Sequence, residues 1–498
     1  MRMPPSLPLI CLLLLWAAAG LSGCSSQKDL YEPSPAPMVS GGLQVQRLWS
    51  RHTGGVTGFY SRLSPSIDSS SIYMAGRDGD VYAFDKISGE RLWHVDLDDE
   101  EENRARRSAR LSGGVTAYAG RVALGSENGY VYVLSSADGQ LLWKHYIGAE
   151  VLTRPVFSKS GDRLFVLDSQ GRLSALEAAS GTLVYISGES TSPLRLRVQS
   201  VPVPVGDEYV LVGRTNGKIL VMLQATGAVV NQITIAQAVG VNALQRIADV
   251  ASSPLLSGSD MFAASYQGGF VEYSFERQAI TRKLGYSSSL DVAMDDEVFV
   301  IVQDDGHVFC VSRATSQELW SNMQLSYRRV TAPVIYGGYV VVGDYEGYLY
   351  FLSLADGSLA ARLSGDGSAV YTAALSDGSN LYVTTAEGTL SCYRYDPEGL
   401  ALQKSMALQV QHDYAGLGVD MRAPGAGDSG IYVPPTMSRE ELMERRRHII
   451  QAVAQMEARQ RAAQRQQEEY ELRRKAYEEE RRRRISGFGI APGIVSSN

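Results

Sequence analysis

The chain has 498 residues, of which 44% are hydrophobic and 20% are charged, and its formal net charge is −7. This composition excludes a wholly disordered chain. The acidic balance argues against a nucleic-acid-binding protein, because such proteins normally present a basic surface. Forty-nine glycines and 27 tyrosines, against 5 tryptophans, indicate many turns and many strands.

The N-terminus carries an export pattern. Arg2 precedes an apolar run from Leu7 to Ala19, which is too short to cross a bilayer as a helix because that takes about 20 residues. The small residues of Leu21-Ser22-Gly23 directly before Cys24 resemble a bacterial lipobox. This resemblance implies a signal peptide over 1–23, cleavage before Cys24 and attachment of acyl chains to Cys24, of which two or more give a stable anchor. The alternative is an ordinary signal peptide followed by a chance cysteine.

The residues after Cys24 bear on location. Ser25 stands where an aspartate often retains such lipoproteins at the inner membrane, so in a bacterium with two membranes we expect outer-membrane sorting with the protein facing the periplasm. Residues 24–42 are rich in serine, proline and glycine. This composition predicts a flexible tether between the anchor and the folded domain.

An internal repeat dominates the chain. Each copy has a short apolar strand, a turn ending in glycine, and a second strand that alternates apolar and polar residues, followed by another turn and a third strand. The turn glycines are Gly79, Gly129, Gly171, Gly217, Gly269, Gly306, Gly347 and Gly388. Their mean spacing is about 44 residues, and a further strand precedes several copies. Four strands in a period of this length predict an all-β fold, an eight-bladed β-propeller over residues 43–396.

Tryptophan placement predicts how the ring closes. Trp93, Trp143 and Trp320 each follow their turn glycine by fourteen residues, and Tyr185 occupies the same position in the third copy. Trp49 lies in a similar segment that has no strands of its own ahead of it. We therefore expect this N-terminal strand to complete the last blade, although a rival outer strand is available at 400–402.

Two cysteines remain in the repeats. Cys310 and Cys392 each lie four residues after a turn glycine, in equivalent positions of different repeats. Equivalent positions seldom bring two sulfur atoms within bonding distance. We expect two small buried core residues rather than a disulfide.

The repeat is similar to the propeller repeats of the pyrroloquinoline-quinone type. Within that group, the lipobox, the eight copies and the stretches Asn242–Val250 and Val341–Tyr350 resemble the BamB family, the propeller lipoproteins of the outer-membrane β-barrel assembly machinery. This resemblance implies a non-catalytic scaffold without cofactors. It also implies, as partners, the barrel-forming subunit and other lipoproteins of the assembly complex.

Long insertions indicate where a partner binds. The widest spacings around Gly217 place extra residues near 187–204 and 236–253. Apolar anchors beside an arginine are typical of protein-binding hot spots. The resemblance implies docking of the barrel-forming subunit through a Leu-x-Leu-Arg loop and an Asp-x-Asp turn, with Ala251 replacing the second aspartate here. The candidate partner-binding residues are Leu194, Leu196, Arg197, Arg246 and Asp249. The alternative is that the leucines fold back under their loop.

The same repeats also suggest a quinone-dependent periplasmic dehydrogenase. Enzymes of that class are propellers that hold a cofactor in the axial channel, beside a ring of adjacent cysteines and calcium ligands. The sequence has no adjacent cysteine pair, and its six histidines are scattered without metal-ligand spacing. We therefore expect no catalytic residue, metal or cofactor. A propeller lipoprotein that binds another envelope partner remains the other alternative.

The repeat pattern stops after Tyr395. Residues 397–437 are interrupted by glycine and proline and are typical of a linker, and Ser438 with Glu441 forms a capping box. A charged helix is predicted over 438–485, followed by a tail over 486–498. Apolar or small residues recur every seven positions from Leu442, which is half of a coiled-coil seam. The helix is either a partner-binding arm or a solvated single helix.

Overall fold

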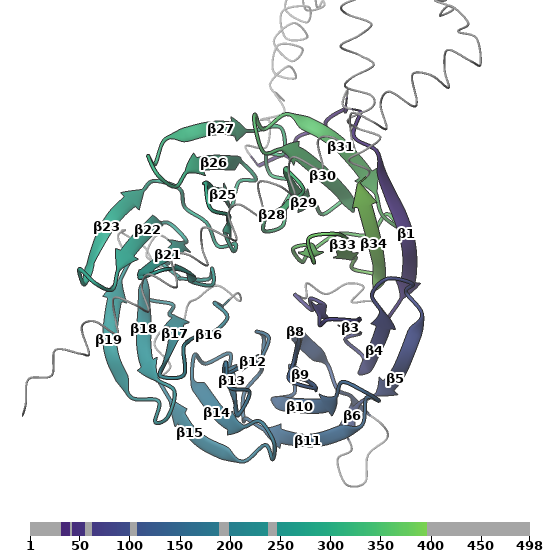
Figure 1. Cartoon of the computed structure of the whole chain (residues 1–498), viewed down its shortest axis with the longest axis vertical. Coiled ribbons are helices and arrows are strands. Elements are labelled where there is room, and N and C mark those ends of the chain that lie inside the picture. Colours follow the sequence, from purple (N-terminus) through teal and green to yellow (C-terminus); the bar gives the residue numbers. More distant parts are fainter. Residues whose placement is uncertain are drawn as a thin grey trace, which may run out of the picture. The chain divides into compact units, whose positions relative to one another are not determined.

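The computed structural model describes residues 31–39, 42–54, 62–99, 107–188, 199–237 and 247–395. Their regular secondary structure consists of strands, which form eight four-stranded antiparallel sheets and one two-stranded ribbon. Figure 1 shows the eight sheets arranged around a common centre. The predicted eight-bladed β-propeller of four-stranded blades is therefore confirmed. The predicted linker, charged helix and tail at the C-terminus lie outside the described residues.

The blades are numbered from 1 to 8 along the chain, with strands given from the centre outward. Blades 1 and 2 comprise β2 (Ser66–Ile67), β3 (Ser71–Ala75), β4 (Asp80–Asp85) and β5 (Arg91–Asp96), then β8 (Leu111–Tyr118), β9 (Arg121–Ser126), β10 (Tyr130–Ser135) and β11 (Leu141–Tyr146). Blades 3 and 4 comprise β12 (Val156–Phe157), β13 (Arg163–Leu167), β14 (Leu173–Glu177) and β15 (Leu183–Ser187), then β16 (Val203–Val205), β17 (Tyr209–Gly213), β18 (Lys218–Leu223) and β19 (Val229–Thr234). The two-stranded ribbon of β6 (Asp98–Asp99) and β7 (Arg107–Ser108) lies between blades 1 and 2 in the chain.

The second half of the ring repeats this order. Blades 5 and 6 comprise β20 (Leu255–Ser257), β21 (Asp260–Ser265), β22 (Gly269–Ser274) and β23 (Ala279–Leu284), then β24 (Ala293–Met294), β25 (Val298–Val302), β26 (Val308–Ser312) and β27 (Glu318–Asn322). Blades 7 and 8 comprise β28 (Val334–Tyr336), β29 (Tyr339–Gly343), β30 (Tyr348–Ser353) and β31 (Leu359–Ser364), then β32 (Leu375–Ser376), β33 (Leu381–Thr384), β34 (Thr389–Tyr395) and β1 (Val45–His52).

The N-terminal strand closes the ring. β1 pairs antiparallel with β34, with Trp49 opposite Cys392, and forms the outer strand of blade 8. The first strand of the propeller therefore shares a sheet with the last three strands. The prediction that the N-terminal strand completes the last blade is confirmed.

The predicted turn glycines occupy the tight turns between the second and third strands of each blade. All eight have positive φ angles, for example 85° at Gly129 and 75° at Gly217. A Cβ atom on Gly217 would lie 2.3 Å from the carbonyl oxygen of Ala236, in the connection to the next blade. Glycine is therefore required at that turn by both the backbone angle and the close approach of the chain.

Neighbouring blades are joined by aromatic side chains of their outer strands. The Trp93 indole donates from Nε1 to the Ser136 carbonyl at 2.9 Å, and its ring covers Gly139 of blade 2, where a Cβ would lie 2.7 Å from the indole. The same contact recurs at Trp49 on Gly89, Trp143 on Gly181, Tyr185 on Gly227 and Trp320 on Gly357. We call this position of the outer strand the aromatic slot.

The cores lie between blades. One cluster combines residues of blades 1 and 2, and another those of blades 6 and 7. Cys310 and Cys392 are buried and free, which confirms the expectation of two unpaired core cysteines. Burial raises the pKa of Cys310 to about 11 and that of Cys392 to about 12, so both thiols stay protonated at neutral pH.

Part of the predicted flexible tether is bound to the ring. Ser34 donates from its backbone nitrogen to the Ser326 carbonyl at 2.9 Å and from Oγ to the Gln324 carbonyl at 2.7 Å. The expectation of a flexible segment therefore does not hold for residues 31–38. The alternating prolines at 33, 35 and 37 give the reason, because proline-rich segments are extended and stiff and lose little entropy on docking.

Candidate partner-binding site

The two long insertions leave the same face of the ring. In each blade, the glycine turn and the connection to the next blade lie at this face, which we call the loop face. The first insertion joins β15 to β16 and the second joins β19 to β20. They flank blade 4 on its two sides, so the turn between β17 and β18 lies between them.

Hydrogen bonds and close packing tie the bases of the two insertions together at blade 4. The Val250 nitrogen donates to the Arg214 carbonyl at 3.0 Å, and the Val201 nitrogen donates to Ser253 Oγ at 3.3 Å. A Cβ on Gly213 would lie 2.7 Å both from Ser200 Cβ and from the Val250 carbonyl oxygen. The described bases of the two insertions therefore approach each other closely at Gly213 of blade 4.

A buried arginine supports this arrangement. The Arg214 side chain is nearly buried and donates from Nη1 to the Gly171 carbonyl of blade 3. Burial lowers the pKa of Arg214, and the nearby Asp168 carboxylate acts in the opposite direction. A Cβ on Gly188, where the first insertion begins, would lie 3.2 Å from Arg214 Nη1. Arg214 thus connects the base of the first insertion to the turn of blade 4.

Of the five predicted partner-binding residues, the structure describes only Asp249. Leu194, Leu196, Arg197 and Arg246 lie outside the described residues. Asp249 is described and is 2% exposed, and its carbonyl accepts from the Tyr266 nitrogen at 3.0 Å. Asp249 thus lies at the base of the second insertion, and its predicted contact with a partner stays a prediction.

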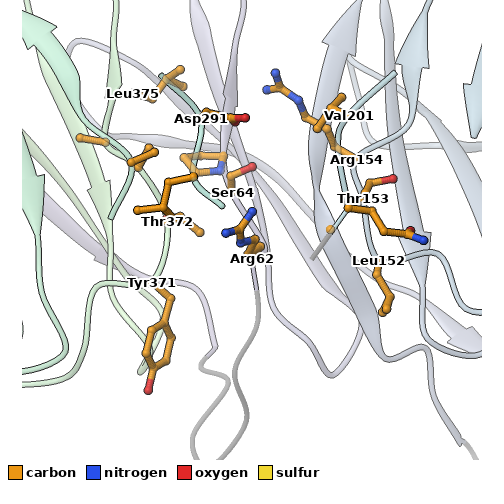
Figure 2. A pocket seen from close by; sticks show the side chains of 17 residues that line it. Arg62, Ser64, Leu152, Thr153, Arg154, Val201, Asp291, Tyr371, Thr372 and Leu375 are labelled. Carbon is orange, nitrogen blue, oxygen red and sulfur yellow. The ribbon is translucent and has the colours of Figure 1, made fainter. Parts of the chain in front are cut away.

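A cavity of about 240 Å³ lies where residues just before or within the innermost strands of seven blades meet. Figure 2 shows that Arg62, Arg154 and Asp291 line it together with threonines, alanines and one aromatic residue, Tyr371. Asp291 Oδ1 accepts from the Ser253 nitrogen at 2.6 Å and is therefore already engaged in the fold. This lining offers neither a pair of aromatic faces nor cysteines for a quinone, so it does not support the dehydrogenase alternative.

Metal sites and membrane-spanning helices are absent from the described part of the chain. No group of three or more His, Cys, Asp and Glu side chains in this part could hold a metal ion. No helix in it is long and apolar enough to span a membrane.

Sequence reasoning missed one buried polar cluster, which we call the Arg328 cluster. Arg328 is 1% exposed and donates from Nε and Nη2 to Asp344 Oδ2 at 2.8 and 2.7 Å. Tyr350 donates to the same oxygen at 2.9 Å, and Arg328 also pairs with Glu346. Asp344, Glu346 and Tyr350 all lie in the Val341–Tyr350 stretch that resembles the BamB family. The motif indicated that Asp344, Glu346 and Tyr350 act together in the structure. Their partner Arg328 lies outside the motif and could not be found from the sequence.

The fold, the repeats and the lining of the central cavity define a class of protein. The chain is an eight-bladed propeller with quinone-type repeats, and the described lining of its central cavity contains no cysteine. A family model described as outer membrane protein assembly factor BamB matches residues 77–322. The outer membrane protein assembly factor BamB of Yersinia pestis is 32% identical over 384 residues, which cover 76% of this chain and 97% of that protein. The chain therefore belongs to the BamB family.

Solved structures agree with the fold. The crystal structure of BamB from Moraxella catarrhalis has a TM-score of 0.62 and 22% sequence identity, covering 70% of this chain and 100% of that chain. The quinohemoprotein alcohol dehydrogenase from Comamonas testosteroni has a TM-score of 0.54 at 13% identity, covering 70% of this chain and 76% of that chain. At such identities these likenesses show the propeller fold alone. The family relationship places the chain among assembly factors and not among enzymes.

Proposed function

We propose that this protein is a non-catalytic scaffold lipoprotein of the outer-membrane β-barrel assembly complex. It binds the barrel-forming subunit and assists the folding and insertion of outer-membrane proteins. The observation that carries this proposal is membership of the BamB family over 97% of the length of a relative.

The partner-binding surface is the loop face of blades 3 to 5. The tied bases of the two insertions support this, because the predicted residues Leu194, Leu196, Arg197 and Arg246 belong to the two segments whose described ends meet at blade 4. Leucine and arginine side chains on such loops supply the apolar anchor and the charge of a hot spot. Asp249, at the base of the second loop, is the fifth residue proposed to contribute to this surface.

The anchor is the diacylglycerol-modified Cys24, at the periplasmic side of the outer membrane. The lipobox-like residues ahead of Cys24 support this assignment. We expect Cys24→Ala to remain uncleaved and to lose labelling by radioactive palmitate. A Cys24→Ala protein that still incorporates palmitate would overturn the assignment.

The test of the scaffold role is affinity purification from detergent-solubilised envelopes. The barrel-forming subunit should co-purify in stoichiometric amount with the unmodified chain. A triple alanine variant at Leu194, Leu196 and Arg197 should recover about tenfold less, because hot-spot residues contribute roughly 1–3 kcal/mol each and not additively.

The matched control is a triple alanine variant at Leu141, Leu142 and Lys144 of β11, which removes two exposed leucines and a cation elsewhere on the rim. This variant should recover the subunit fully. Both variants must keep the thermal midpoint of the parent. Full recovery with the folded Leu194, Leu196 and Arg197 variant would place the docking site elsewhere, and loss of the subunit from the unmodified chain would contradict the scaffold role.

A further inference from the structure

Residues 31–38, which we call the strap, lie along blades 6 and 7. Figure 1 shows the N-terminal trace passing beside β31 before it enters β1. At its start, the Tyr31 ring meets the Tyr327 ring edge to face at a centroid distance of 5.5 Å. At its end, Arg362 of β31 donates from Nη1 to the Pro37 carbonyl at 2.9 Å. The strap is therefore held at both ends by groups of the ring.

The middle of the strap completes the Arg328 cluster. Arg328 Nη1 donates to the Ser34 carbonyl at 2.7 Å, while its Nε and Nη2 donate to Asp344. The guanidinium carries five N–H donors and is 1% exposed. Without the strap, a donor of a buried cation would lose its acceptor, which costs free energy unless water replaces it. The family-like motif thus supports a guanidinium that binds the N-terminal segment.

The strap begins at the loop face. Its partners Gln324, Ser326 and Tyr327 belong to the connection between β27 and β28, which crosses that face from blade 6 to blade 7. Tyr31 follows Cys24 by seven residues, so the two Cα atoms lie at most about 25 Å apart. From Leu43, the buried residue just ahead of β1, the same cysteine is nineteen residues away and could lie up to about 65 Å distant. Docking of the strap therefore shortens the reach of the anchor by more than half.

We propose that the strap is a fixed part of the propeller and that it sets the orientation of the ring on the membrane. By holding the chain at the loop face of blades 6 and 7, it makes this part of the rim the surface that faces the bilayer. The proposal rests on the proposed lipid anchor at Cys24 for the membrane step, but the docking of the strap stands on its own contacts. The opposite side of the ring, with blades 2 to 4, is then turned away from the lipid.

The first experiment measures whether the strap is docked in the full-length lipoprotein in detergent. Nitroxide labels are placed by Met38→Cys and Met323→Cys, at side chains that are 92% and 57% exposed. The buried Cys310 and Cys392 do not compete for the label. Pulsed electron resonance should give one narrow distance distribution. A broad distribution in this otherwise unmodified chain would overturn the proposal.

A release variant and a matched control sharpen this measurement. Ser34→Pro with Arg362→Ala removes donors on both sides of the contact while keeping the strap extended, and should broaden the distribution while the β-type circular dichroism of the folded ring is retained. The control is Lys144→Ala, because Lys144 occupies the register position of Arg362 in blade 2 and lies 5.2 Å from the Tyr130 ring, as Arg362 lies 4.8 Å from the Tyr348 ring. The control should leave the distribution narrow. Broadening in the control alone would contradict a specific strap.

The second experiment measures orientation on vesicles of phosphatidylethanolamine and phosphatidylglycerol with a headgroup acceptor dye. A donor dye is placed by Met323→Cys at blade 6 or by Tyr146→Cys at blade 2, both exposed at the loop-face end of an outer strand. Energy transfer should be at least twofold larger from blade 6, and the release variant should bring the ratio close to one. A ratio near one in the unmodified chain would contradict the orientation.

A chain produced without residues 1–24, which lacks both the signal peptide and Cys24, separates the two proposals. It should show no transfer from either position, because the anchor is lost, and leave the nitroxide distances unchanged. Persistent transfer in this chain would refute the anchor assignment while the nitroxide distances still decide whether the strap is docked.

Discussion

Two interfaces join the outer strand of one blade to a turn of the next by different contacts. They lie between blades 1 and 2 and between blades 5 and 6. In the first, the Trp93 indole covers Gly139, whose φ is 74°. In the second, Arg282 occupies the aromatic slot and donates from Nη1 to the Arg313 carbonyl at 2.6 Å and to Ser316 Oγ at 2.7 Å, and Ser316 has φ 62°. The hydrogen bond to the neighbouring blade is kept, while the ring and the glycine are both absent.

The slot and the facing turn therefore change together. Asn231 occupies the slot between blades 4 and 5, and the facing turn has Gln278 with φ 52°. A hollow of about 270 Å³ remains there, lined by both residues. A turn that faces an aromatic slot thus requires glycine because of the ring above it and not because of the backbone angle alone. Ser316 and Gln278 adopt the same left-handed conformation at turns that no ring covers.

The largest effect is expected at an aromatic slot. Trp93→Ala removes a nearly buried indole and its hydrogen bond, and should lower the free energy of unfolding by about 3–5 kcal/mol. Urea unfolding monitored by circular dichroism would measure this. Trp93→Phe keeps ring packing without the donor and should lose roughly half as much. A loss below about 1 kcal/mol for the alanine variant would remove the distinction between the two kinds of interface.

Substitutions in the turn that faces the slot test the same difference between the two kinds of interface. Gly139→Ala places a Cβ 2.7 Å from the indole at a positive φ, and should cost about 2–3 kcal/mol. Ser316→Gly should change stability by less than about 1 kcal/mol, since no aromatic ring covers Ser316. Equal losses for the two substitutions, measured by the same urea titration, would show that the ring is not what selects glycine.

The arginine slot should contribute less than a tryptophan slot. Arg282→Ala removes two hydrogen bonds and an ion pair with Glu272 at 2.7 Å, all partly exposed, and should cost about 1–2 kcal/mol. Added salt should weaken the effect of Arg282→Ala but leave that of Trp93→Ala unchanged. A salt-independent loss would indicate that Arg282 acts through its aliphatic packing.

The two cysteines report on tryptophan slots, because Cys310 lies opposite Trp320 and Cys392 opposite Trp49 in the strand register. Burial raises their pKa values to about 11 and 12, so at pH 8 only about one thiol in a thousand is ionised even at Cys310. The native protein should show no thiol reactive with a disulfide reagent at pH 8 and, with the proposed lipid on Cys24, two in urea. Trp320→Ala should increase the reaction rate of Cys310 selectively. A third thiol in urea would mean that Cys24 carries no lipid.

The smallest effect is expected from the C-terminal extension. Truncation after Asp396 removes the predicted linker and charged helix but none of the strands of the ring. The thermal midpoint should stay within a few degrees. A fall of more than about 10 °C would show that the extension packs on the propeller, because a surface contact of 1–2 kcal/mol shifts the midpoint by less in a domain of this size.

Local sequence signals predicted most of the ring and little of its surface. Turn glycines such as Gly129, the alternating strands and the tryptophan at position 49 yielded the blade number and the closing strand, because these signals repeat and act within a few residues of the chain. The Arg328 cluster could not be predicted, since Arg328 meets Ser34 and Asp344 only after the ring is built.

Ring closure has a consequence for biogenesis. Val45 pairs with Tyr395, 350 residues further along the chain, so the propeller cannot be completed until its last blade is available. Until then, β1 keeps an unpaired edge, and unpaired strand edges are templates for aggregation. A premature stop anywhere before the last strand would therefore leave an open ring rather than a shorter one. On the proposed route of export, folding should thus depend on periplasmic factors that shield strands between export of the first strand and arrival of the last.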